Sequence, residues 1–198
     1  VAETSDELMD KFFSGEEFTQ EEIRKGLLQG VRSGAIAPVF CGSAITTEAI
    51  NPLLNAIVTI LPSAADNAGE QAKTPGGEDL YVDCNADDPL AAFVFKTVTD
   101  PFVGKMSYIK VVSGKLAASS SPTNVRAGVP ERMGKLVTIR GKKQEDTDCI
   151  VAGDIGVVCK LAEAVTGDSI CDPRRLVLFD KAPFPKPSLT MAIQLKGK

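Results

Sequence analysis

The chain has 198 residues, enough for one large or two small domains, and its 43% hydrophobic and 24% charged residues are typical of a globular protein. It contains no histidine, which excludes Ser-His and Cys-His catalysis and His-ligated metals. No apolar run reaches the roughly 18 residues of a membrane helix, and the five cysteines form no C-x-x-C pair, so we expect buried, reduced thiols in a cytoplasmic protein rather than a zinc site.

The first 34 residues predict two short helices. A capping box at residues 4–7 precedes an apolar stripe that ends at Gly15. A second capping box, at residues 19–22, begins a helix that Gly34 ends. Residues 1–30 hold eight acidic and three basic residues, which indicates either a solvated acidic face or a contact with a basic protein partner.

The next elements predict an incomplete α/β unit. The unalternated apolar run Ile36–Cys41 is typical of a parallel strand buried on both faces, and residues 50–61 form a helical stripe that Pro62 closes. A parallel strand needs neighbours and none precede this one, so we expect residues 1–62 to be the last portion of a larger α/β domain. The triplet Gly42-Ser43-Ala44 follows the strand, where α/β sheets bind ligands, although an ordinary turn with Ser43 as a cap also explains it.

Residues 63–87 are rich in Ala, Asp, Asn, Gly and Pro and predict a loop or linker, in which residues 80–82 have strand character. From Ala91 the hydrophobic period changes to two, and Ser113-Gly114-Lys115 predicts a hairpin turn. Short strands without helices between them favour a closed β-barrel over residues 88–182. The strands expected here are Phe93–Val98, Met106–Val112, Arg132–Arg140, Gly156–Leu161 and Leu176–Phe179.

After the barrel, residues 183–198 predict an extended, proline-rich linker followed by the first strand of a further unit, Ser188–Leu195. The chain therefore has a mixed fold class, with a partial α/β unit before an all-β barrel.

Basic residues gather in the middle of the chain. Residues 102–143 contain one acidic residue, Glu131, and nine basic residues, which predicts a surface that faces a polyanion such as RNA; a solvated lysine-rich face is the alternative. Two aromatic residues in this segment, Phe102 and Tyr108, are expected to be core residues rather than platforms for stacked bases. The basic residues are Lys105, Lys110, Lys115, Arg126, Arg132, Lys135, Arg140, Lys142 and Lys143.

The motifs of nucleotide hydrolysis are missing from this sequence. None of its five Gly-Lys pairs completes G-x-x-x-x-G-K-[ST], and no Asn-Lys-x-Asp occurs that could read guanine. We therefore expect that this chain alone neither binds nor hydrolyses a nucleotide and is not an enzyme. A nucleophilic Cys41 would lack a histidine base.

Several stretches, in this order, resemble elongation factor G, a multidomain translation GTPase. They are VAETSDELMDKFFSGEEFTQEEIRKGL, IAPVFCGSA, NPLLNAIVTILPS, AFVFKTVTDPFVGKMSYIKVVSGKL, ERMGKLVTIRGKK, AGDI and TGDSICD. The resemblance implies that residues 1–62 are the end of the GTPase domain, residues 88–182 the domain II barrel after a linker at 63–87, and residues 183–198 the entry to domain III.

The resemblance also implies partners. Gly42, Ser43 and Ala44 are similar to a guanine-contacting loop, with GTP or GDP bound only in the full-length parent. The barrel would pack on the GTPase domain and contact RNA and proteins of the small ribosomal subunit, without a membrane. Translocation is the implied function. Ribosomal protection of the tetracycline-resistance kind, a ribosome-recycling paralogue and a stand-alone RNA-binding barrel module are the alternatives.

Overall fold

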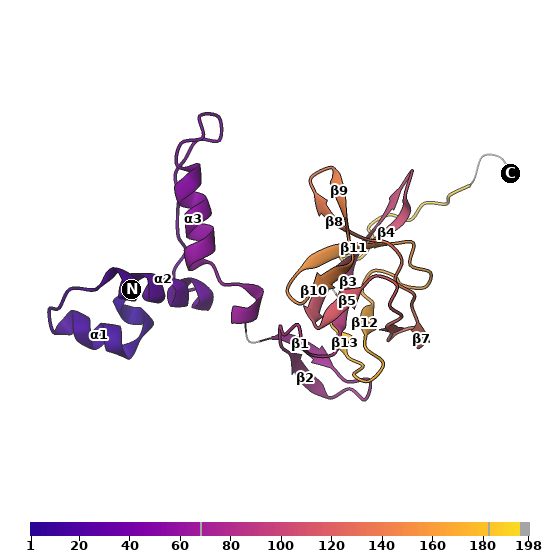
Figure 1. The fold of residues 1–198 in the computed structure, drawn as a ribbon, viewed down its shortest axis with the longest axis horizontal. Coiled ribbons are helices and arrows are strands. Elements are labelled where there is room, and N and C mark those ends of the chain that lie inside the picture. The colour runs from indigo at the N-terminus through magenta and orange to yellow at the C-terminus, as the bar shows by residue number, and fades with distance from the viewer. Residues whose placement is uncertain (68, 182, 195–198) are drawn as a thin grey trace. The chain divides into compact units, whose positions relative to one another are not determined.

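A computed structural model describes residues 1–67, 69–181 and 183–194. The chain divides into two compact units, Val1–Asn67 and Ala68–Lys198 (Figure 1). The first unit is helical and the second consists of β-strands, so the mixed fold class predicted from the sequence is confirmed. Among the described residues, no helix is both long and apolar enough to cross a membrane.

The helical unit begins with a short 3-10 turn, η1, before helix α1. The predicted first capping box is wrong, because Ser5 rather than Thr4 caps α1: the Ser5 hydroxyl accepts a hydrogen bond from the Leu8 amide at 3.3 Å. The second capping box is confirmed at Thr19 and Glu22 of α2. The helical elements of the described residues are η1 Ala2–Thr4, α1 Asp6–Phe13, α2 Gln20–Ser33, α3 Ile50–Ile60 and η2 Ala64–Asp66.

The strand predicted at Ile36–Cys41 does not form. Val39 is 87% exposed and Phe40 is also exposed, because no neighbouring strand among the described residues offers hydrogen-bond partners or a face to pack against. The helix predicted after it does form as α3, but none of its residues is buried. The apolar residues of this region thus form a helix, but they do not build a hydrophobic core.

The second unit contains three sheets in the described part of the chain. An eight-stranded antiparallel sheet has the order β7-β6-β12-β3-β4-β11-β8-β9, and two smaller sheets have the orders β10-β5 and β13-β1-β2. The strands are β1 Glu70–Lys73, β2 Asp79–Val82, β3 Ala91–Asp100, β4 Gly104–Ser113, β5 Lys115–Ala117, β6 Thr123–Asn124, β7 Val129–Pro130, β8 Leu136–Arg140, β9 Lys143–Thr147, β10 Cys149–Val151, β11 Ile155–Cys159, β12 Ser169–Cys171 and β13 Leu178–Phe179.

Residues 70–82 form a hairpin rather than a linker. Strand β2 was expected from residues 80–82, but β1 was not, since Glu70–Lys73 is polar at three of its four positions. The remaining position, Ala72, is buried and pairs with Phe179 of β13, so the hairpin is part of the β unit. A turn at residues 74–77 closes the hairpin, with the Gly77 amide donating to the Thr74 carbonyl at 2.9 Å.

The hairpin turn predicted at residues 113–115 is wrong. Strand β5 leaves the sheet of β4 and pairs with β10 instead. Gly114 marks this corner with φ of 73°, and a Cβ there would lie 2.7 Å from the Leu90 backbone, so only glycine fits. The predicted strand Arg132–Arg140 is confirmed only from Leu136 onward.

The large sheet and the small β5–β10 sheet enclose one apolar core. Ile109 and Ile170 of the large sheet contact this core together with Leu116 of β5 and Ile150 of β10, and all four are fully buried. Within the described residues β7 and β9 have one strand neighbour each, so the sheet curls into a barrel-like domain without closing its hydrogen-bonded ladder.

Beyond the barrel-like domain, the expected strand Ser188–Leu195 is absent from residues 188–194, and Leu195 lies outside the described residues. Leu189, Met191 and Ile193 alternate with small or polar residues in a strand-like pattern, yet all three are exposed. As at residues 36–41, the pattern has no neighbouring strand in the described part of the chain.

Candidate nucleic-acid interface

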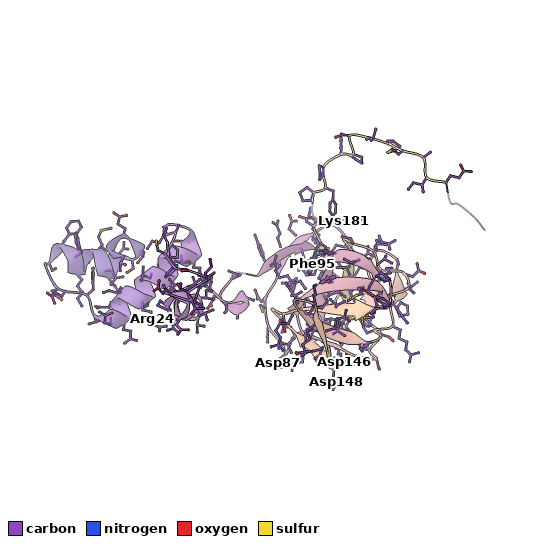
Figure 2. The ribbon with its side chains drawn as sticks, turned by 90° about the horizontal axis from the view of Figure 1, so that it is seen from above. Arg24, Asp87, Phe95, Asp146, Asp148 and Lys181 are labelled. Atoms are coloured by element: carbon purple, nitrogen blue, oxygen red, sulfur yellow. The ribbon has the colours of Figure 1, made fainter. Side chains whose placement is uncertain are left out.

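Six of the nine basic residues in the 102–143 segment form ion pairs, and their acidic partners lie outside that segment. The charge excess counted along the sequence is therefore largely compensated in space. The ion pairs are Lys110–Glu70, Lys115–Asp87 at 3.7 Å, Arg126–Asp168 at 2.6 Å, Lys135–Asp146 at 2.8 Å, Arg140–Glu145 at 2.5 Å and Lys143–Glu145 at 3.0 Å. Figure 2 labels one of these partners, Asp146, beside Asp148 at the end of β9.

Arg126 is exposed, but its guanidinium is held by the buried carboxylate of Asp168. Its guanidinium donates to both oxygens of Asp168, which also accept hydrogen bonds from the Asn124 amide and the Val165 backbone. Burial raises the pKa of Asp168, but the hydrogen bonds, led by that from Arg126, outweigh it and leave this pKa below its ordinary value. The pair joins β6 to the turn before β12, which is a structural role.

Three of the predicted residues, Lys105, Arg132 and Lys142, form no ion pair within the described residues. Lys142 lies in the turn of the β8–β9 hairpin, and Lys105 lies at the start of β4. The tips of the β3–β4 and β8–β9 hairpins both project at the top of the barrel-like domain in Figure 1. This end of the domain therefore carries uncompensated positive charge.

A groove of about 580 Å³ lies beside the β3–β4 turn. Its floor includes the carboxylate of Glu131, which is only 2% exposed and accepts hydrogen bonds from the backbone amides of Ala162, at 2.6 Å, and Glu163, at 3.2 Å. Arg132 and Lys160 are exposed cations that line it. The full lining is Val103, Pro130, Glu131, Arg132, Gly134, Lys135, Cys159, Lys160, Ala162 and Glu163.

Lys160 was not among the sequence-predicted residues, because it lies 17 positions beyond the basic segment. Its backbone amide donates to the Lys105 carbonyl at 2.7 Å, which brings the two lysines together at the end of β11 and β4. Its φ of 59° is unusual for a residue other than glycine. Only the antiparallel pairing of β11 with β4 could have revealed this proximity.

The expectation that Phe102 is a core residue is wrong. Phe102 is 96% exposed in the turn between β3 and β4. Tyr108 behaves as expected: it is half-buried, packs against an apolar cluster and meets the Phe95 ring at 6.2 Å between centroids. The flanking Pro101 and Gly104 were the signal for an exposed turn at Phe102.

The predicted guanine-contacting triplet forms a tight loop before α3. The Ser43 amide donates to the Glu48 carbonyl at 3.1 Å, and the Ser43 hydroxyl accepts from the Thr46 amide at 3.2 Å. A Cβ at Gly42 would lie 2.9 Å from the Glu48 carbonyl oxygen, so this position requires glycine. Ala44 is exposed in the same loop. The triplet is thus brought together, with the Ser43 amide engaged within the loop.

The cysteines are free thiols, of which Cys159 and Cys171 are buried and Cys41 is exposed, contrary to the expectation of buried thiols throughout. Burial raises the pKa of Cys171 to about 11, so this thiol stays protonated. Among the described residues no group of three or more acidic or cysteine side chains is placed to hold a metal ion.

Comparison with known proteins accounts for the β unit. A family model described as elongation factor G domain 2 matches residues 89–173, which extend from just before β3 through β12. These residues are therefore similar to domain 2 of elongation factor G, which confirms the resemblance predicted from the sequence over this part of the chain. It is also similar, over 95% of its length, to a crystal structure of a Thermus thermophilus protein, with 28% sequence identity and a TM-score of 0.73. The present chain covers 26% of that longer chain.

Proposed function

We propose that this chain is part of a translation GTPase of the elongation factor G kind that drives ribosomal translocation in the cytoplasm. Its barrel-like domain docks on the RNA and proteins of the small ribosomal subunit and packs on the GTPase domain. The observation that carries the proposal is the match of residues 89–173 to elongation factor G domain 2, on a barrel-like fold.

The helical unit supports a place within a larger α/β domain. Helix α3 has no buried residue although Val58 and Leu54 are apolar, and Val39 is exposed before it. An exposed apolar surface of this kind marks a site that binds another surface. The nucleotide, GTP or GDP, would be bound by the complete GTPase domain, to which Gly42, Ser43 and Ala44 contribute a loop.

This chain by itself is proposed to be inactive toward GTP, since its sequence has no phosphate-binding motif. A calorimetric titration of the chain with GDP tests this. We expect no heat of binding; tight binding of guanine nucleotides would mean that residues of this chain build a nucleotide pocket by themselves.

RNA docking is proposed to occur at the end of the barrel-like domain that carries Lys105, Arg132 and Lys142. Cations without an acidic partner can neutralise phosphates and release counterions, whereas paired cations must first give up an ion pair. Lys143 contributes less, because Glu145 already compensates part of its charge.

Co-sedimentation with small ribosomal subunits over a range of salt concentrations tests this docking. The triple variant Lys105→Glu, Lys142→Glu and Lys143→Glu should bind more weakly, and the slope of its salt dependence should fall by about one unit for each phosphate that it no longer neutralises. The matched control is Lys73→Glu, at an exposed position of β1. Equal binding of the triple variant and the control at every salt concentration would contradict the proposal.

A further inference from the structure

The turn between β3 and β4 presents an aromatic side chain that the docking of phosphates does not explain. Phe102 is 96% exposed. Its exposed fraction is larger than that of four other exposed phenylalanines, Phe12, Phe13, Phe40 and Phe184. A phenyl ring exposed to water gains none of the hydrophobic stabilisation that burial would give it. Phe102 therefore contributes little to folding, and its ring is accessible to a partner.

We propose that Phe102 is a stacking platform for an unpaired RNA base, and that the adjacent groove accommodates the nucleotide that follows it. This inference rests on the proposed docking to RNA and names the kind of RNA contacted: single-stranded nucleotides rather than a duplex.

Hydrogen bonds fix the backbone of the turn that carries the ring. One carboxylate oxygen of Asp100 accepts hydrogen bonds from the amides of Phe102 and Val103, both at 2.8 Å. These two bonds lower the pKa of Asp100, so the carboxylate is ionised and the turn intact at neutral pH. Pro101 restricts the chain before Phe102, and Gly104 follows with φ of 86°. A rigid aromatic loses little entropy on binding.

The groove begins at the residue after Phe102, because Val103 lines it. Its volume of about 580 Å³ lies within the range of small-ligand sites, roughly 300–1,000 Å³. Exposed Arg132 and Lys160 line the groove and can contact phosphates, and the Lys160 amide donates to the Lys105 carbonyl at 2.7 Å. The ring and the cations thus combine base stacking with backbone neutralisation, as single-strand binding requires.

The acidic side chains in and near the groove restrict which ligand it can bind. The Glu131 carboxylate is satisfied by backbone amides on the groove floor, and Asp146 compensates Lys135. Glu163 is exposed and lines the groove, so it repels a phosphate placed next to it but can accept a hydrogen bond from an amino group of a base. A nucleotide with its base toward Glu163 and its phosphate toward Arg132 satisfies both.

The test measures binding of the chain to a fluorescein-labelled 12-nucleotide single-stranded RNA and to a duplex of the same sequence. Phe102→Ala should weaken single-strand binding about tenfold, the change expected from loss of one stacked base, and leave duplex binding unchanged. Phe102→Tyr should retain binding, whereas Phe102→Leu, which is apolar without a π face, should bind like the alanine variant. Phe184→Ala, another exposed phenylalanine, is the matched control.

A direct readout is available because the sequence contains no tryptophan. Phe102→Trp places a single fluorophore at the site, and stacking of a base on the indole should quench its emission in proportion to the RNA bound. Leu189→Trp, in the exposed segment after the barrel-like domain, should show no quenching. Circular dichroism spectra identical to that of the unmodified chain would show that each variant is folded.

The outcomes separate this inference from the docking proposal. If charge reversal at Lys105 and Lys142 weakens association with small subunits while Phe102→Ala and Phe102→Leu bind RNA as the unmodified chain does, docking stands and stacking is overturned. If Phe102→Ala weakens association with subunits but single-stranded RNA does not bind or quench, Phe102 contacts a protein and stacking is again overturned. If neither RNA nor subunits bind, both proposals fail.

Discussion

The helical unit and the β unit contain similar apolar residues, but these residues are buried almost only in the β unit. In the described chain every buried hydrophobic residue except Leu8 lies in the β unit, although α3 alone contains Leu53, Leu54, Ile57 and Val58. The helical unit is held by local bonds, such as the capping box of α2, and by the close approach of Gly30 to Ile36.

Hydrophobic periodicity therefore predicts where a helix or strand forms, but it does not predict whether the apolar face of that element is buried. The β-strands find partners within residues 69–181 and enclose a core, whereas the helical unit leaves no residue of α3 buried and leaves Val39 and Phe40 exposed. The β unit should therefore respond to core substitutions as an independent domain, and the helical unit should not.

The largest effect is expected from Leu116→Ala. Leu116 is fully buried in the shared core, and its truncation should lower the free energy of unfolding of the β unit by about 3–5 kcal/mol. Val58→Ala in α3, at a side chain that is 83% exposed, should change it by less than about 0.5 kcal/mol. Urea denaturation followed by circular dichroism measures both. Similar losses for the two variants would show that α3 is covered in solution.

A smaller effect is expected from Asp168→Ala. It removes the acceptor for Arg126, Asn124 and the Val165 amide, which should cost about 2–3 kcal/mol at pH 7. Because the pKa of folded Asp168 is lowered, its contribution is complete above the ordinary aspartate pKa of about 4 and is lost as the pH falls below it.

Urea midpoints at pH 7 and pH 3 check this prediction. The difference between Asp168→Ala and the unmodified chain should be smaller at pH 3 than at pH 7, since protonation already weakens the pair with Arg126 in the unmodified chain. A difference that is the same at both pH values would mean that packing of Asp168, rather than its charge, stabilises the turn.

Much of the fold could be predicted where a local signal decides the structure. The capping box at Thr19 set the start of α2, and alternation of apolar residues set β3 and β4. Strands of two or three residues, such as β6 and β12, were missed because they are too short for a period to show. The polar strand β1 was missed because only Ala72 faces the core.

The site could be predicted less well, because it depends on contacts between distant parts of the sequence. The basic segment lost most of its net charge to acids from β1, β9 and the turn before β12, which no count within the segment includes. Lys160 joined the groove through pairing of β11 with β4. The hydrophobicity of Phe102 predicted a core residue, whereas Pro101 and Gly104 on either side of Phe102-Val103 are typical of an exposed turn.

A more local effect is expected in the helical unit, from Thr19→Ala. The Thr19 hydroxyl caps α2 by accepting from the Glu22 amide, and its loss should destabilise this helix by about 1 kcal/mol. Hydrogen exchange of the amides in residues 20–33 should accelerate while that of β4 stays unchanged. Thr59→Ala, whose hydroxyl bonds to the Asn55 carbonyl within exposed α3, is the control.

Acid should have a related effect on α2. A hydrogen bond from Lys11, with further ones from Thr19, lowers the pKa of Glu22 to about 2, so the stabilisation by this carboxylate is complete above about pH 4.5 and is lost as the pH falls toward 2. Exchange in α2 that is insensitive to both Thr19→Ala and acid would show that packing of Gly26 and Gly30, not the cap, holds the helix.

The smallest effect on stability is expected from Lys135→Ala. The ammonium of Lys135 and the carboxylate of Asp146 are 2.8 Å apart, but both side chains are mostly exposed, at 60% and 71%. Solvent and salt screen such a pair, so the urea midpoint should not change measurably. Its removal nevertheless frees Asp146 near the groove, so association with small subunits should weaken at low salt, and the difference from the unmodified chain should disappear as salt is raised. A shift of the urea midpoint without a change in association would instead assign Lys135 to folding of the β unit and not to binding of small subunits.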